Sequence, residues 1–335
     1  MSAQHGLITR TQALDLGLSP LSIGAAVRSG EWMAMCRGVY ADAVVWEALD
    51  EYRGRPLLKA RAAVLTMRRD CVLSHDSAAH ALELDILTPA KPFVHVTRAG
   101  FTGAWTKAGV KHHLAGFRPE QVVRAGGMPT LDLARTAIDI ARERGFLDGL
   151  VAVDAALRMG VTRLQLEEAL EPMTSWPNIT KARAAVSAGD PGAQTVLESL
   201  GRDLVLEMGI GAPDTQFPVA ISSGVAWCDI RVGNHVFETD GWLKLVPVSR
   251  GGVATKSAEE VLRDQRKRET LICREGLGMT RWVYADFFGA RRAEAKASAL
   301  RDYEVTLDRY GADLPEHLAR NAAEIRAREA RRRTA

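Results

Sequence analysis

The stretch VAWCDIRVGNHVFETDGWLK, Val225–Lys244, restricts the possible fold more than any other part of the chain. Its first half, Val225–Val232, is apolar and rich in residues that favour strands. Gly233-Asn234 is a two-residue turn signal, and the strand pattern resumes at His235. The stretch therefore predicts two antiparallel strands joined by a tight turn.

Three carboxylates gather on this predicted hairpin. Counting outward from the turn places Asp229 directly opposite Glu238, and Asp240, two residues further on, points the same way. Like charges in facing positions destabilise a sheet, so the patch needs a stabilising partner. A divalent cation held by oxygen ligands is the usual partner, and we expect Mg²⁺. The structural alternative is that Asp229 closes a turn, and that Glu238 and Asp240 pair with Lys244 or with the basic cluster at 266–268.

Length and composition permit several kinds of globular protein. The 335 residues suffice for two or three domains, and a net charge of +3 permits nucleic-acid binding without demanding it. The four cysteines are scattered without zinc-site spacing, so we expect reduced thiols in a cytoplasmic protein. The first residues show no signal pattern, and no apolar run approaches the ~18 residues of a membrane span, so we expect no membrane association.

Residues 5–42 predict a winged helix-turn-helix. A short helix ends at Gly17, a second helix starts at Ser19-Pro20, and a hairpin covers Glu31–Ala41. In this layout the second helix enters the major groove of DNA and the hairpin is the wing. The candidate DNA-contacting residues are Arg10, Ser22, Arg28 and Arg37. Because the second helix has few base-reading side chains, a protein-interaction module is the alternative.

The region 67–190 predicts strands followed by helices. Pro92–Thr97 and Val110–Leu114 have strand patterns, and helical periodicity runs from 131 to 187. His112 and His113 lie next to each other in the second strand, which invites a metal interpretation. Adjacent strand residues point to opposite faces, so we favour packing roles for this pair.

Asp190-Pro191-Gly192 predicts a boundary between the two halves of the chain. After it, Thr195–Met208 forms an amphipathic helix with Glu198 on the edge of its apolar face. Three strands, a charged helix over Ala258–Cys273 and a closing strand follow. This αβββαβ order can hold one or two Mg²⁺ ions between carboxylates, as phosphodiester cleavage requires, with Lys or Arg on the phosphate.

We therefore expect a mixed α+β protein of four parts. They are a winged helix-turn-helix over 1–66, a region of strands then helices over 67–190, an α/β domain over 191–288 and a charged helical tail over 289–335. The tail carries both charges, which favours a solvated helix with i,i+4 ion pairs over a nucleic-acid arm.

Three stretches of the first half together resemble a known family. GLITRTQALDLGLSPLSIGAAVRSGEW…RGVY resembles the winged-helix domain of AbiEi-type antitoxins, which are transcriptional repressors of abortive-infection toxin–antitoxin systems. VLSHDSAAHALEL and LDLARTAIDIAR…VAVDAALRMGVTRLQL resemble the segments that follow in actinobacterial members. The resemblance implies that the chain binds DNA and has a nucleotidyltransferase-type toxin as its partner.

The last third resembles the domain related to very-short-patch-repair (Vsr) endonucleases, with a PD-(D/E)XK-like, restriction-endonuclease-like fold. The matching positions are Glu198 and Arg202 in ESLGR, Gln216, Asp229 in WCDIRVG, Glu238-Thr239-Asp240-Gly241 in FETDG, Lys244, and RKRE at 266–269.

This second resemblance implies a set of site residues. Glu198, Asp229 and Glu238 would hold Mg²⁺, with Asp240 auxiliary, and Lys244 would contact the phosphate or orient the attacking water. The implied DNA contacts on the charged helix are Arg266, Lys267 and Arg268. The pattern has a lysine two positions after the second acid, where this chain has Asp240, and Lys244 is the nearest substitute.

Three hypotheses about function follow. The first is a DNA-binding, antitoxin-like repressor with a nuclease-like C-terminal domain. The second is a Mg²⁺-dependent endodeoxyribonuclease targeted by its winged helix, and the third is a non-catalytic interaction protein. The missing lysine and the antitoxin-like first half favour the first hypothesis.

Overall fold

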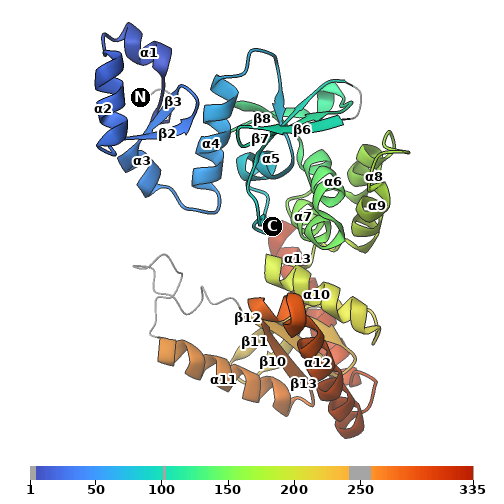
Figure 1. Cartoon of the computed structure of the whole chain (residues 1–335). Coiled ribbons are helices and arrows are strands. Elements are labelled where there is room, and N and C mark those ends of the chain that lie inside the picture. The colour runs from blue at the N-terminus through green and yellow to red at the C-terminus, as the bar shows by residue number, and fades with distance from the viewer. Residues whose placement is uncertain (1–4, 101–102, 241–257, 335) are drawn as a thin grey trace. The chain divides into compact units, whose positions relative to one another are not determined.

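The computed structural model of the chain describes residues 5–100, 103–240 and 258–334. It confirms a mixed α+β fold, with two compact units, Met1–Asp190 and Pro191–Ala335, which are described separately (Figure 1). The division falls at the Asp-Pro-Gly sequence. The finer division into four parts stays a prediction. No helix among the described residues has the length and apolar character needed to cross a membrane.

The first unit begins with the expected helix-turn-helix and hairpin. Thr9 caps the first helix, because its Oγ1 accepts a hydrogen bond from the Gln12 backbone N–H at 3.1 Å. Ser19 caps the second helix, with Pro20 at its first position. A short strand that the sequence did not reveal completes an antiparallel sheet of order β1-β3-β2. The elements are β1 (Leu7–Thr9), α1 (Arg10–Asp15), α2 (Pro20–Arg28), β2 (Trp32–Cys36) and β3 (Val39–Asp42).

The connection that follows is two helices, α3 (Ala43–Ala48) and α4 (Gly54–Leu65). Asp50 explains the break. Its carboxylate accepts hydrogen bonds from the backbone N–H groups of Arg53 at 2.7 Å and Gly54 at 3.0 Å. Because these bonds satisfy the first amides of α4, a new helix starts there.

A six-stranded sheet of order β6-β7-β5-β4-β9-β8 forms the middle of the first unit. Met128–Leu131, expected to lead into a helix, is a strand paired with the preceding one. Gly126 and Gly127, both with positive φ, form the two-residue turn that pairs them. The elements are β4 (Val72–Leu73), α5 (His75–Leu82), β5 (Val94–Arg98), β6 (Gly103–Lys107), β7 (Val110–Leu114), β8 (Val122–Ala125) and β9 (Met128–Leu131).

Four helices complete the first unit, as the periodicity predicted. They pack around an alanine-rich core in which α6 and α7 lie closest together. Gly149 of α7 permits this approach, because a Cβ there would overlap Ala141 Cβ and lie 2.7 Å from Ala141 Cα. The helices are α6 (Leu133–Arg144), α7 (Phe146–Arg158), α8 (Arg163–Leu170) and α9 (Ile179–Ala188).

We expect Gly149→Ala to destabilise the first unit. Ala normally stabilises a helix interior by up to about 1 kcal/mol over Gly, but overpacking a closed core costs about 1–3 kcal/mol. A net loss of about 1–2 kcal/mol would lower Tm by about 2–8 °C, measured by circular dichroism. Gly24→Ala in α2 is the matched control, since a Cβ there meets only the end of the flexible Arg28 side chain. Equal effects of the two changes would contradict this packing.

The second unit has the predicted αβββαβ order and adds two C-terminal helices. Its sheet has the order β10-β11-β12-β13, antiparallel except for the parallel pair β12-β13. Gly201 of α10 lies against one face, and α11 and α13 contribute Ile272 and Leu318 to the core on the other. The elements are α10 (Val196–Met208), β10 (Asp214–Ile221), β11 (Gly224–Val232), β12 (His235–Asp240), α11 (Ala258–Arg274), β13 (Gly278–Val283), α12 (Gly289–Tyr310) and α13 (Glu316–Thr334).

The hairpin β11-β12 has the predicted turn and register next to it, with Val232 opposite His235 and Ile230 opposite Phe237. The ladder ends there, so the pairing of Asp229 with Glu238 that we counted from the turn is not formed. Instead, Asp229 Oδ2 accepts hydrogen bonds from both the backbone N–H and the hydroxyl of Thr239, each at 2.8 Å. The Asp229 carboxylate thus binds a backbone N–H group that a longer ladder between β11 and β12 would use.

Candidate functional site

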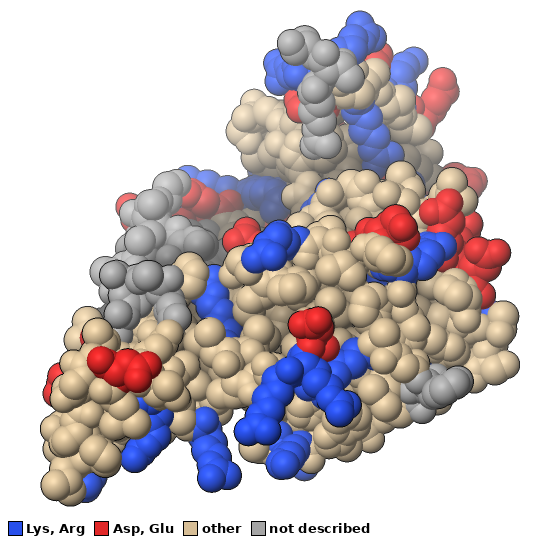
Figure 2. All heavy atoms as spheres, turned by 90° about the horizontal axis from the view of Figure 1, so that it is seen from above, with Lys and Arg blue, Asp and Glu red and all other residues tan. Residues whose placement is uncertain are grey.

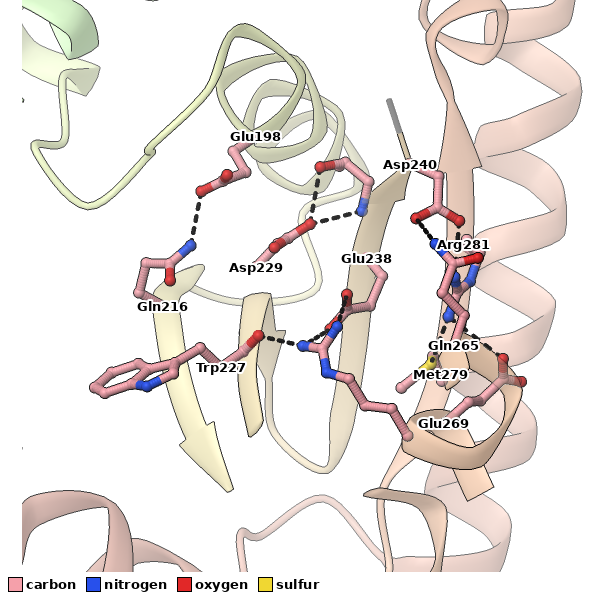
Figure 3. Close-up of polar contacts among 12 residues, drawn as sticks. Glu198, Gln216, Trp227, Asp229, Glu238, Asp240, Gln265, Glu269, Met279 and Arg281 are labelled. Atoms are coloured by element: carbon pink, nitrogen blue, oxygen red, sulfur yellow. Dashed lines mark hydrogen bonds and ion pairs between the residues drawn. The ribbon is translucent and has the colours of Figure 1, made fainter. Parts of the chain in front are cut away.

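Four acidic residues of the second unit lie near the end of the β11-β12 ladder, namely Glu198, Asp229, Glu238 and Asp240 (Figure 3). Glu198, in the first turn of α10, is only 5% exposed. Its Oε2 accepts hydrogen bonds from the Gln194 backbone N–H and from Gln216 Nε2, both at 2.8 Å. Burial and the neighbouring charge of Asp229 raise the pKa of Glu198 above its usual value. Glu198 is therefore a firmly positioned carboxylate next to a second one.

Glu238 is the most perturbed acid of this group. It is 4% exposed, and burial together with the charge of Asp229 raises its pKa to about 7. Arg268 of α11 partly offsets this effect, because its guanidinium lies 3.2 Å and 3.3 Å from the two carboxylate oxygens. The same guanidinium also donates to the Trp227 carbonyl. Arg268, predicted as a DNA contact, is thus engaged with Glu238 in this structure.

Asp240 faces the same helix but has another partner. Arg281 of β13 donates to its Oδ2 at 2.7 Å, and Gln265 of α11 lies 3.4 Å from Oδ1 (Figure 3). The sequence left open that Asp240 forms an ion pair with Lys244 or with the cluster at 266–268. Asp240 does form an ion pair, but its partner is Arg281. Lys244, the predicted phosphate contact, lies outside the described residues.

The acids supply the type of ligand that a divalent cation binds, but their oxygens do not converge on one point. Carboxylate oxygens are the ligands that Mg²⁺ prefers, and two of the three predicted ligands have raised pKa values, which a cation would relieve. Their oxygens are not within 4.8 Å of one another as a set of three among the described residues. Arg268 contacts both oxygens of Glu238, so a metal ion at Glu238 would compete with this ion pair.

The raised pKa of Glu238 predicts a pH-dependent stability difference between the protein and Glu238→Gln. Between pH 4.5 and about 7 the folded state keeps a proton that the unfolded state has lost, so the Glu238 contribution to the free energy of unfolding falls as pH rises. Gln does not titrate, so the variant should be about equally stable at pH 4.5 and about 3 kcal/mol more stable above pH 7.

Urea unfolding at several pH values in metal-free buffer measures this difference. Glu304→Gln, at an exposed position of α12, is the matched control and should show no such trend. Parallel stability curves for the protein and Glu238→Gln would contradict the raised pKa.

The four predicted DNA contacts of the winged helix are all exposed. Arg10 begins α1, and its backbone N–H donates to the Gly38 carbonyl at 2.8 Å, so it lies beside the wing turn that carries Arg37. Ser22 and Arg28 lie on α2, where the Ser22 hydroxyl is 2.8 Å from the capping Ser19 hydroxyl. Figure 2 shows the face of the molecule that is seen from above. Lys and Arg side chains stand out along its lower edge, where Asp and Glu side chains are fewer.

The two other predicted DNA contacts, Arg266 and Lys267, are exposed on α11. Sequence reasoning missed one group with clear chemical potential, formed by His75, His95 and His113 in the first unit. No local spacing connects these three residues, and only the sheet pairing of β5 with β7 shows that two of them meet.

Comparison with known proteins agrees with a DNA-binding first segment. Residues 2–41 match the family described as transcriptional regulator, AbiEi antitoxin. This match supports a DNA-binding, antitoxin-like role for that segment.

The chain is also similar to two uncharacterized proteins of Mycobacterium tuberculosis, one from strain CDC 1551 and one from strain H37Rv. Each is 28% identical over 156 residues, which is 44% of this chain and 56% of the relative. The chain thus spans about half the length of the curated relatives it matches.

Proposed function

We propose that the chain is a DNA-binding transcriptional regulator of the antitoxin type. The observation that carries the proposal is the match of residues 2–41 to the AbiEi antitoxin regulators over a segment folded as a winged helix-turn-helix. The helix α2 enters the major groove, and the wing and the start of α1 contact the phosphates. Such a role belongs in the cytoplasm, where the DNA is.

The partner that this proposal implies is a toxin of the nucleotidyltransferase type. The nuclease-like C-terminal unit is then a binding module that faces DNA or the toxin. Coexpression with the product of a neighbouring reading frame, followed by copurification, tests this part separately from DNA binding.

A gel shift and a footprint on the DNA upstream of the gene test the regulator proposal. The expected result is a protected site bound more tightly than unrelated DNA, with an affinity that falls as salt rises. Equal affinity for unrelated DNA, or no protected site at low salt, would refute it.

Metal-dependent cleavage of DNA is a second candidate function. The observation in its favour is the group of Glu198, Asp229 and Glu238, in which burial and the neighbouring charge of Asp229 raise the pKa of the two glutamates. These residues would hold Mg²⁺, and Asp240 would hold Arg281 in place beside them. When bound, Mg²⁺ supplies charge stabilisation at the phosphoryl oxygens and a more acidic water. Arg268, once released from Glu238, is positioned to contact the phosphate.

The same protein preparation tests the second candidate. Plasmid, linear and mismatched DNA are incubated with Mg²⁺ or Mn²⁺ beside the gel shift. Nicking that EDTA abolishes supports an endonuclease. If the DNA stays intact but a footprint is seen, only the regulator proposal is supported.

A further inference from the structure

Three buried histidines from different elements meet in the first unit. His75 is the first residue of α5, His95 lies in β5 and His113 lies in β7. Their exposed fractions are 5%, 4% and 8%. Each brings one ring nitrogen within 4.8 Å of the other two, the single such group of three ligand side chains in the described part of the chain. We call these residues the histidine cluster.

The rings of the histidine cluster are nearly parallel. The His75 and His113 ring centroids lie 4.0 Å apart at 17°, and those of His95 and His113 lie 5.3 Å apart at 14°. His95 Nδ1 is 3.0 Å from His113 Nε2. Zn–N bonds of about 2.0–2.1 Å place two tetrahedral ligand nitrogens roughly 3.3 Å apart, which is close to the separation of this pair, and the stacked rings must turn for their in-plane lone pairs to converge on one ion.

The backbone positions of the three residues bring their rings together in the histidine cluster. β5 and β7 are parallel, with Thr97 opposite His113, which puts the two strand histidines on neighbouring strands. His75 has a φ of +49°, a conformation that residues with a side chain rarely adopt, and its ring stacks on His113. A strained backbone at a polar cluster is a frequent mark of a functional site.

The three imidazoles are neutral at physiological pH and therefore have a lone pair to donate. Burial lowers the pKa of His95 and of His113 to about 4, and it lowers the pKa of His75 well below its usual value. A metal ion requires such unprotonated nitrogens.

Partners on the outer side orient the rings. His75 Nδ1 is 3.0 Å from Ser74 Oγ, and His95 Nε2 is 4.0 Å from Asp76 Oδ2. Asp76 is itself held by Arg144 at 3.1 Å. A carboxylate behind a histidine favours the tautomer whose N–H faces it, which leaves His95 Nδ1 unprotonated, with its lone pair on the side of His113.

We propose that the histidine cluster binds one Zn²⁺ ion, with His75, His95 and His113 as ligands and water in the fourth position. Three imidazoles select zinc and its neighbouring transition metals, whereas Mg²⁺ prefers oxygen ligands. The ion would join α5 to the sheet at β5 and β7. The alternative role, a buried hydrogen-bonded stack, explains the contact between His95 and His113 but leaves His75 bonded only to its neighbour Ser74.

A neighbouring cavity approaches this cluster, although none of the three histidines lines it. It has a volume of about 560 Å³, and Asp76, Ser77 and Val94 are among its lining residues. Asp76 belongs both to this cavity and to the contacts of His95.

Zinc binding to the full chain, stripped with EDTA and studied without DNA, tests the proposal independently of the proposed function. Titration against a competing chelator should show one Zn²⁺ per chain. His113→Gln and His95→Gln should each weaken binding by at least about 100-fold, since loss of an outer-shell partner alone costs 10–100-fold. His112→Gln is the matched control, because this adjacent side chain stacks on Trp105 and is not in the cluster.

Two further readouts separate a ligand role from a structural one. Co²⁺ in place of Zn²⁺ should give the visible absorption of a tetrahedral site in the protein and in His112→Gln, but not in His113→Gln. Zn²⁺ should raise Tm in the same two proteins only. The proposal is overturned if the folded protein binds no stoichiometric Zn²⁺, or if both cluster variants bind it as tightly as His112→Gln. If neither cluster variant folds, the Co²⁺ spectrum of the unaltered protein decides.

Discussion

Replacing Arg10, Arg28 and Arg37 together with alanine should lower the affinity for the upstream DNA by about 10²-fold at 0.15 M salt. Each neutralised phosphate contributes about 0.9 to the slope of log K against log salt. At 0.15 M salt this amounts to roughly a five-fold change in affinity for each lost contact. The variant should also flatten the salt slope by about 2.7, since counterion release from three phosphates is lost.

Fluorescence anisotropy at a series of salt concentrations measures both quantities. Arg68→Ala, Arg69→Ala and Arg183→Ala combined make the matched control, because all three positions are exposed in the same unit and the change in net charge is the same. Equal losses in the two triple variants would mean that overall charge, and not the winged helix, drives binding.

Asp229→Ala should reduce any metal-dependent nicking of DNA by about 10³-fold or more, and Glu238→Ala should do the same. A catalytic metal supplies several kcal/mol of transition-state stabilisation, and each 1.36 kcal/mol is a factor of ten in rate. Because Asp229 also holds Thr239, Asp229→Asn is added as a variant that keeps an oxygen acceptor for it. A plasmid-nicking time course in Mg²⁺ or Mn²⁺ gives the rates.

Asp214→Asn is the control for this series. It removes the same charge from β10, where Asp214 pairs with Arg231 and Arg326, away from the acids that hold the metal in our proposal. Full activity in Asp229→Ala would show that the nicking comes from elsewhere in the preparation or from another site. The gel shift should be unchanged in every member of the series, because the winged helix is untouched.

Local signals made the winged helix and the central turn predictable from the sequence. Ser19-Pro20 starts a helix through contacts within four residues, and Gly233-Asn234 fixes the hairpin register next to it. The end of the ladder before Asp229 and Glu238 was not predictable in this way. There the Asp229 side chain competes with the backbone for the hydrogen bond from the Thr239 N–H. The alternation of apolar and polar residues does not indicate this competition.

The acids and the histidines illustrate the same limit at longer range. The alternation rule places His112 and His113 on opposite faces, and His112 does stack on Trp105, away from the cluster. Which residues face His113 depends on the parallel pairing of β5 with β7 and on the start of α5, 38 positions away in the chain. Similarly, nothing in the sequence pattern of α11 indicates that Arg268, among its several cations, is the one that reaches Glu238.

The ion pair between Arg268 and Glu238 implies thermodynamic coupling between two ligands. A cation at the acids competes with Arg268 for Glu238, and a DNA phosphate competes with Glu238 for Arg268. The ligand that binds first bears the free-energy cost of breaking the ion pair between Arg268 and Glu238, and the second ligand does not. Metal and DNA should therefore each bind more tightly when the other is present. This cooperativity is reciprocal, and it requires no change in the backbone.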